Sequence, residues 1–155
     1  MTALYMFHRI EAAPRRWRAV AESLTKSVAE GRLWGIWRSQ IGRPRDELTA
    51  LTLWPAGTSA SAAEAALAQD SRDIRFIATE ALVPTLRPTD LTPPARQGNY
   101  AFRWFATPEA DWPEFLDLCA AGWPGFEAAY DSQVIGLWRA TGDRTAAGSD
   151  SATGA

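Results

Sequence analysis

The sequence holds few side chains that could perform acid–base or nucleophilic chemistry. Its 155 residues include one His, one Cys and one Lys: His8, Cys119 and Lys26. Histidine is the side chain whose ordinary pKa lies near neutrality, so His8 is the first candidate for a general base or a haem ligand. The competing interpretation is that His8 is a hydrogen-bonded structural residue. We favour this one, because a lone histidine on an apolar strand more often has a structural role.

Several classes of site are excluded by these counts. One His and one Cys cannot supply a zinc site built from several such ligands, and one Cys forms no disulfide within the chain. Cys119 stands among Phe115, Leu116 and Leu118, a pattern typical of a buried, unreactive thiol in a helix. No nucleophile elbow, phosphate loop or dinucleotide-binding glycine pattern occurs. We therefore expect no metal and no cofactor, and assign no catalytic residue.

Tryptophan is the abundant residue with a possible binding role. Of the eight Trp residues, Trp37 and Trp138 each stand directly before an arginine, Arg38 and Arg139. Adjacent residues of a strand point to opposite faces, so the two members of each pair separate. Stacking on a flat aromatic ligand is one interpretation of Trp37 and Trp138, and packing between helices and sheet is the other.

The elements that would position these residues begin with a strand at residues 4–10. Alternation places Tyr5, Phe7 and Arg9 on one face and Met6, His8 and Ile10 on the other. An amphipathic helix follows Pro14 and is expected to stop at Gly31.

A hairpin of two strands comes next, at residues 32–41 and 48–54. Ser61 and Glu64 suggest a capping box for a helix at 62–69, before a fourth strand at 74–83. The order β-α-β-β-α-β predicts an α+β, ferredoxin-like unit: a four-stranded antiparallel sheet with both helices on one face. The other face of this sheet is left uncovered, so we expect it to pack against another chain or against a second copy of the unit.

An internal repeat offers such a partner. Tyr5, Phe7 and Trp17 recur as Tyr100, Phe102 and Trp112 at an offset of 95 residues; Gly35, Trp37 and Arg38 recur as Gly136, Trp138 and Arg139 at an offset of 101. We interpret this as an incomplete second copy of the unit. The six extra residues are expected around 122–125, as a break between two helical pieces.

The repeat divides the chain into four segments. We expect a first unit at 1–86, a proline-rich linker at 87–98, a partial second unit at 99–141 and a disordered tail at 142–155. The second copy stops after its second strand, at 133–140. A neighbouring chain is therefore expected to cover an exposed strand edge there.

The repeat also pairs His8 with Arg103, because both occupy the fourth position of a Tyr-x-Phe-x segment. A cation at both positions would suit an anionic or enolate ligand, since a guanidinium binds oxyanions well. Two unrelated surface charges are the alternative.

Net charge and hydropathy argue against nucleic acid and membranes as partners. The formal net charge is -2, so there is no basic excess to bind nucleic acid. No stretch approaches the ~20 apolar residues that span a membrane, and the N-terminus has no signal-peptide pattern. We expect a cytoplasmic protein with no membrane partner.

In these strand and hairpin segments the chain resembles the NIPSNAP-like group of the dimeric alpha-beta barrel superfamily. The resemblance depends on two first-strand segments, residues 5–10 and, more closely, 100–105. It also depends on the glycine and aromatic hairpin at 35–42, which leads to the strand ending in Trp54-Pro55. It covers about residues 3–86 fully and 99–140 partly. The first copy has His8 where the family shows arginine.

The resemblance implies two ferredoxin-like units packed sheet to sheet as a barrel, within one chain or between chains. Superfamily members include cofactor-independent monooxygenases of polycyclic aromatic compounds and haem-degrading enzymes. We expect a homo-oligomer that binds a small aromatic or hydrophobic molecule, or an assembly domain. His8, Arg103, Trp37 and Trp138 are the candidate ligand-binding residues. The alternative is a monooxygenase or tailoring enzyme acting on a polycyclic aromatic substrate.

Overall fold

A computed structural model of the chain describes residues 4–27 and 32–142. The first half contains β1 (Leu4–Ala12), α1 (Trp17–Ser27), β2 (Arg32–Arg38), β3 (Glu47–Trp54), α2 (Ala60–Ala68) and β4 (Ile74–Pro84). A 3₁₀ turn (Glu109–Asp111), α3 (Trp112–Ala129) and β5 (Trp138–Ala140) follow. The predicted element order of the first half is confirmed, and the fold class is α+β.

The strands form one open antiparallel sheet in the order β2-β3-β1-β4-β5. The first four stand in the order of a ferredoxin-like fold. β1 is central, with His8 opposite Ala50 of β3 and Thr79 of β4. β5 adds to the edge at β4, where Leu82 faces Ala140.

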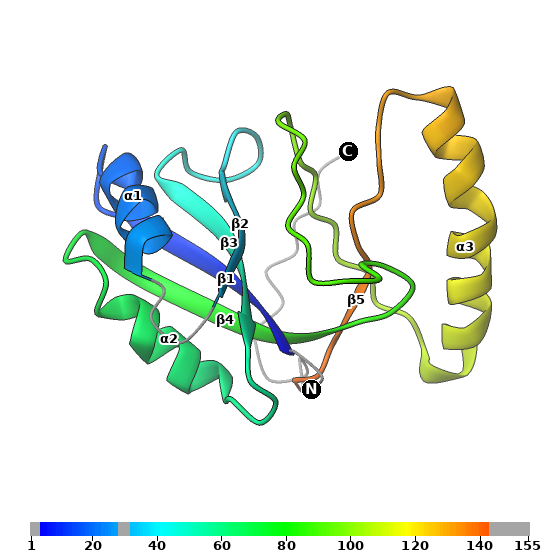
Figure 1. Ribbon diagram of the computed structural model, residues 1–155, viewed down its shortest axis with the longest axis horizontal. Helices are drawn as coiled ribbons and strands as arrows, with labels where there is room; N and C mark the ends of the chain where they lie inside the picture. The colour runs from blue at the N-terminus through cyan, green and yellow to red at the C-terminus, as the bar shows by residue number, and fades with distance from the viewer. Residues whose placement is uncertain (1–3, 28–31, 143–155) are drawn as a thin grey trace.

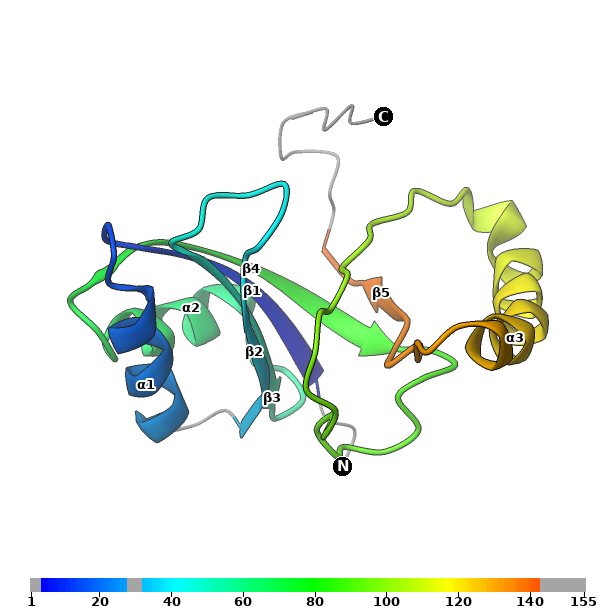
Figure 2. The same ribbon diagram turned by 90° about the horizontal axis from the view of Figure 1, so that it is seen from above.

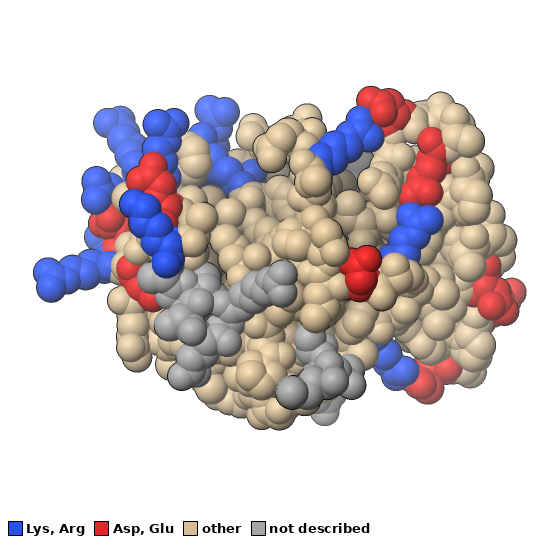
Figure 3. Space-filling view, in the orientation of Figure 1, with Lys and Arg blue, Asp and Glu red and all other residues tan. Residues whose placement is uncertain are grey.

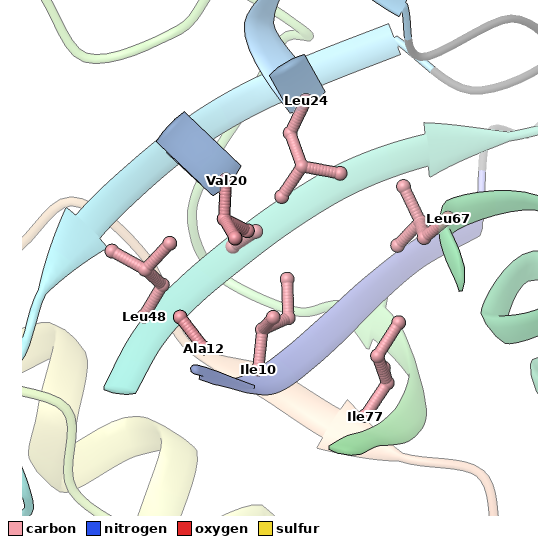
Figure 4. Packing of buried hydrophobic residues seen from close by; sticks show 8 residues of the cluster. Ile10, Ala12, Val20, Leu24, Leu48, Leu67 and Ile77 are labelled. Carbon is pink, nitrogen blue, oxygen red and sulfur yellow. The ribbon is translucent and has the colours of Figure 1, made fainter. Parts of the chain in front are cut away.

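Both helices of the first half cover one face of the sheet, as expected (Figures 1 and 2). Val20 and Leu24 of α1 and Leu67 of α2 pack on a core that also contains Ile10, Ala12, Leu48, Ala50 and Ile77 (Figure 4). Burying a Val, Leu or Ile side chain stabilises a fold by ~1.5–3 kcal/mol. All residues of this layer belong to the first half.

The start of α2 differs from the prediction. The helix begins at Ala60, and Ser59 is the N-cap, whose hydroxyl accepts a hydrogen bond from the Ala62 amide at 3.1 Å. The predicted capping box at Ser61 and Glu64 is therefore wrong by two residues. Ser59 has extended backbone dihedrals, which a cap requires, whereas Ser61 lies inside the helix.

The second half departs further from what its sequence predicts. Residues 100–105, which resemble the first strand of the family, form no strand. Only 138–140 of the expected strand at 133–140 join the sheet. α3 is one continuous helix through Pro124, so the predicted break at 122–125 is wrong. The expected end of the first helix at Gly31 and the expected tail, apart from Gly142, lie outside the described residues.

Arg87 contacts α3 on both sides of Pro124. Arg87 donates hydrogen bonds to Glu127 at 2.6 and 3.3 Å and to the Val134 carbonyl at 2.9 Å, and its guanidinium lies 5.1 Å from the Trp123 ring centre. The hydrogen bond from Arg87, with a second from the Val134 amide, lowers the pKa of Glu127. One arginine thus fixes both halves of the helix.

α3 stands apart from the layer that contains α1 and α2, on the other side of the sheet (Figures 1 and 2). Among the described residues, no helix combines the length and the apolar character needed to span a bilayer.

Candidate functional site

The face of the sheet opposite α1 and α2 carries an aromatic cluster. We use this name for Tyr5, Phe7, Trp34, Trp37, Tyr100, Phe102 and Trp138, whose rings contact one another. Four of these residues come from β1 and β2 and three from the second half. The cluster therefore joins the first sheet to residues 99–140.

Trp34 lies at the centre of the aromatic cluster and is 2% exposed. Its ring contacts Tyr5 and Trp138, both at 5.7 Å between ring centres, in edge-to-face geometry. The sequence did not single it out, because simple alternation along β2 places it away from Trp37. The register of β2 against β3 shifts between Leu33 and Gly35, so Trp34 is the extra residue of a bulge. That bulge turns Trp34 to the same face as Trp37.

Each of the two Gly-x-Trp-Arg segments places its indole over its own glycine. A Cβ added to Gly35 would lie 2.1 Å from the Trp37 ring, and one added to Gly136 would lie 2.1 Å from the Trp138 ring. These glycines therefore have a shared role: they leave room for a large ring to lie against the backbone.

The arginines of these segments point the other way, toward the helices. The Arg38 guanidinium lies 4.1 Å from the ring centre of Trp17 in α1, and that of Arg139 lies 5.3 Å from Trp112 in α3. Arg139 also pairs with Glu109. The expectation that Trp and Arg separate to opposite sides is confirmed for both segments.

Aromatic contacts between the halves run crosswise. Trp37 contacts Tyr100 at 5.1 Å, and Trp138 contacts Tyr5 at 5.7 Å. Phe7 and Phe102 contact each other at 5.7 Å. Aromatic pairs at such distances contribute ~0.5–1.5 kcal/mol beyond their burial.

Two indole N–H groups in the aromatic cluster are buried without a hydrogen-bond acceptor among the described residues. They are Nε1 of Trp34 and Nε1 of Trp138. A buried donor without a partner costs ~1–3 kcal/mol. A bound molecule with an acceptor atom would remove that cost.

Beside the aromatic cluster lies a cavity of about 1540 Å³, which we call the main cavity. Phe7, Leu51 and Leu82 of the first sheet form its floor, and residues 94–109 and 131–140 form its walls. One face of α3 closes it, through Trp112, Phe115, Cys119, Trp123 and Phe126. It is larger than the ~300–1,000 Å³ of a typical small-molecule site.

A second, smaller cavity of about 200 Å³ is lined by residues 35–37 of β2, Pro94, residues 96–98 and Tyr100. Pro94, residues 96–98 and Tyr100 also line the main cavity.

His8 lies on the other face of the sheet, in the layer beneath the helices. It is fully buried; Nδ1 is 2.8 Å from the Thr79 hydroxyl and Nε2 is 2.7 Å from the Thr52 hydroxyl. Trp54 donates from Nε1 to the same Thr52 hydroxyl at 2.6 Å. Both ring nitrogens are satisfied, one as donor and one as acceptor. Burial lowers the pKa of His8 to about 3, so the ring is neutral at physiological pH.

Three of the four predicted binding residues line a cavity. Trp37 and Trp138 lie in the aromatic cluster, where Trp37 lines the smaller cavity and Trp138 the main one. Arg103 also lines the main cavity, and His8 lines neither. Burial raises the pKa of the Cys119 thiol, which also lines the main cavity. Within the described part of the chain, no three His, Cys, Asp or Glu side chains are grouped to hold a metal ion.

Comparison with known proteins finds no family model that matches the chain and no curated protein of significant similarity.

Proposed function

We propose that this chain is an assembly domain of the dimeric alpha-beta barrel type, as its resemblance to NIPSNAP-like proteins implies. In this proposal a complete ferredoxin-like unit is followed by a partial second copy that folds back onto the first sheet. The domain acts by binding another polypeptide through the part of the barrel that the second copy leaves open.

The matched contacts of the two halves carry this proposal. Residues paired by the sequence repeat make corresponding contacts: Arg38 with Trp17 and Arg139 with Trp112, and Trp37 with Tyr100 and Trp138 with Tyr5. A two-fold relation between two copies produces such crosswise pairs, and Phe7 with Phe102 would lie near its axis.

Large apolar side chains are exposed along the main cavity. Phe105 is 62% exposed, and Trp104 and Phe126, which also line this cavity, are exposed too. Large exposed apolar patches mark sites of protein association. On the face shown in Figure 3, one group of Lys and Arg side chains lies near α1, and Arg96, Arg103 and Arg139 line the main cavity.

Binding of a small aromatic or hydrophobic molecule is the second candidate. The two indole N–H groups without an acceptor favour it, because a flat ligand with a carbonyl could stack in the aromatic cluster and accept from Trp138. The monooxygenase alternative loses its base, since His8 is buried, neutral and away from both cavities. Monooxygenase activity would then depend on Arg103 alone among the predicted residues.

Light scattering on the intact chain tests the assembly proposal. We expect a mass that exceeds 17.0 kDa and rises between about 1 and 100 µM, because the open apolar surface associates. Phe105→Asp should reduce this association. Ile41→Asp is the matched control, since Ile41 is 94% exposed and lines neither cavity. A monomer throughout that also fails to bind an apolar dye would contradict assembly.

A further inference from the structure

We propose that the chain docks on anionic lipid membranes through one end of its first sheet. We call this end the cationic end, and it consists of residues 9–18, 38–47 and 70–76. None of these residues lines the main cavity or the smaller one. The inference therefore goes beyond the assembly proposal and is independent of it.

The register of the strands brings the three segments of the cationic end together. One row of paired residues crosses the sheet here: Arg38, Leu48, Ile10 and Ile77. The turns beyond this row therefore share one end of the sheet (Figure 1). Two backbone hydrogen bonds connect them directly, from the Ala12 amide to the Asp46 carbonyl at 2.9 Å and from the Ala13 amide to the Asp73 carbonyl at 2.7 Å.

Positive charge dominates the cationic end. Its three segments contain nine Arg and five Asp or Glu residues, a formal excess of four positive charges, whereas the whole chain has a net charge of -2. Figure 3 shows a group of such side chains near α1. Because the charges are distributed unevenly, the net charge of the chain understates the attraction of this end to an anionic surface.

Arginines neutralise two of the carboxylates at this end and leave other arginines free. Arg16 binds Asp73 at 2.8 Å, and Arg9 and Arg43 each lie 3.7 Å from Glu47, which is buried. Five further exposed arginines form no ion pair with any described residue: Arg15, Arg18, Arg45, Arg72 and Arg75. Their charges are available to an external anion.

The loop between β2 and β3 gives the cationic end an apolar tip. Ile41 is 94% exposed. The next residue, Gly42, has a φ of 82°, in the left-handed region that favours glycine. Arg38 donates from Nε to the Arg45 carbonyl at 2.8 Å and so ties the base of the loop together. The loop therefore projects an aliphatic side chain between arginines.

An exposed isoleucine among arginines suits the interface of an anionic bilayer. Guanidinium groups are attracted to anionic headgroups, and an aliphatic side chain enters the apolar layer beneath them. Single exposed apolar residues are common on protein surfaces, but the cationic surroundings of Ile41 distinguish it. The expectation of no membrane partner considered spanning segments and net charge, whereas surface docking needs no spanning segment.

Nucleic acid fits the cationic end less well than a membrane does. Single-stranded nucleic acids stack their bases on accessible aromatic rings. Both aromatic residues of this end have a guanidinium over the ring: Arg38 lies 4.1 Å from the ring centre of Trp17, and Arg9 lies 5.7 Å from that of Phe76. The side chain of Ile41 has no group that hydrogen-bonds to a base or a phosphate. We therefore assign the cationic end to lipid.

Sedimentation of the intact chain with lipid vesicles tests the inference. We expect saturable binding to phosphatidylcholine vesicles that contain about one third phosphatidylserine, and none to phosphatidylcholine alone. Raising NaCl from about 50 to 500 mM should weaken binding at least about tenfold, because salt screens the arginines.

Substitution of Ile41 tests the apolar part of the site. Ile41→Ser should weaken vesicle binding about tenfold, because the tip then loses the side chain that enters the bilayer. Leu118→Ser is the matched control and should leave binding unchanged, since Leu118 is 65% exposed on α3, on the far side of the molecule from α1 (Figure 1).

Paired substitutions test the charged part. Arg45→Gln with Arg72→Gln should weaken vesicle binding roughly 30-fold, and both side chains are exposed, so the fold should be retained. Arg96→Gln with Arg103→Gln removes the same charge from the second half and should have no effect. The inference is overturned if the chain binds neither type of vesicle, if the control variants weaken binding equally, or if the chain binds single-stranded RNA in place of vesicles.

Discussion

His8 illustrates how the surroundings of a residue decide its chemistry. Alternation along β1 correctly placed it with Met6 and Ile10, beneath the helices. The sequence does not show that Thr52 and Thr79 bind both ring nitrogens, because these residues are 44 and 71 positions away. With both nitrogens satisfied and no solvent contact, the ring acts as a structural link between three strands.

The low pKa of His8 predicts that acid destabilises the chain. Its pKa is about 3 when folded and ordinarily 6.5, so the unfolded chain binds an extra proton between these values. This contribution is fully present above about pH 6.5 and is lost as the pH falls toward 3, with a slope of ~1.4 kcal/mol per pH unit. Urea unfolding of the chain and of His8→Gln, from pH 7.5 to 4.5, measures it. The variant should be less stable at pH 7.5 and show a shallower slope; parallel curves would refute this account.

At the scale of elements, the Gly-x-Trp-Arg segments act as connectors between layers. Each sends an indole to the aromatic cluster and a guanidinium to a helix tryptophan. The glycine permits this by leaving the space that the ring occupies. Gly35 and Gly136 were visible in the sequence as repeat positions, but their function depends on ring placement that spacing alone does not show.

Substituting these glycines by alanine should destabilise the chain. In Gly35→Ala or Gly136→Ala the new methyl group would lie 2.1 Å from a Trp ring, so the ring must move; we expect a loss of ~1–3 kcal/mol in the free energy of unfolding. Gly122→Ala is the control, because nothing lies within 4 Å of its added Cβ. In mid-helix that change should stabilise by ~0.5–1 kcal/mol. Equal effects at all three positions, measured by denaturant unfolding, would contradict the packing role.

Element prediction succeeded where local signals and tertiary contacts agree. The four strands and two helices of the first half form where their apolar periodicity predicts them, and each packs against neighbouring elements. Residues 100–105 also have strand character, but no strand within residues 4–27 and 32–142 pairs with them, so they lack the hydrogen bonds of a sheet there. Conversely, Pro124 signals a break, and Arg87 holds the helix on both sides of it.

As a whole molecule, the chain combines a well-packed half with a loosely supported one. The first half has a continuous core between sheet and helices, whereas α3 has no buried residue. The two halves meet through the pairing of β4 with β5, through the aromatic cluster and through the linker residue Arg87. The sequence repeat predicted that the halves belong together. It did not predict the size and lining of the main cavity, because these depend on contacts between residues far apart in the chain.

Hydrogen exchange of the isolated chain should separate the two halves. We expect the central amides of β1 and β3 to open only with global unfolding, and those of residues 100–105 to exchange within about tenfold of unfolded rates. The amides of α3 should be intermediate, because its backbone hydrogen bonds lack covering side chains. Mass-resolved exchange at neutral pH distinguishes these classes. Uniform protection of both halves would show that the chain unfolds as a single cooperative unit.

The edge-to-face contact between Trp34 and Trp138 has an optical consequence. The two indoles belong to opposite halves of the chain, and their ring centres are 5.7 Å apart. Electronic transitions of chromophores this close couple, so the pair contributes to the ultraviolet circular dichroism of the chain, and this contribution requires contact between the two halves. The molecule thus contains its own spectroscopic reporter of that contact, with no label required.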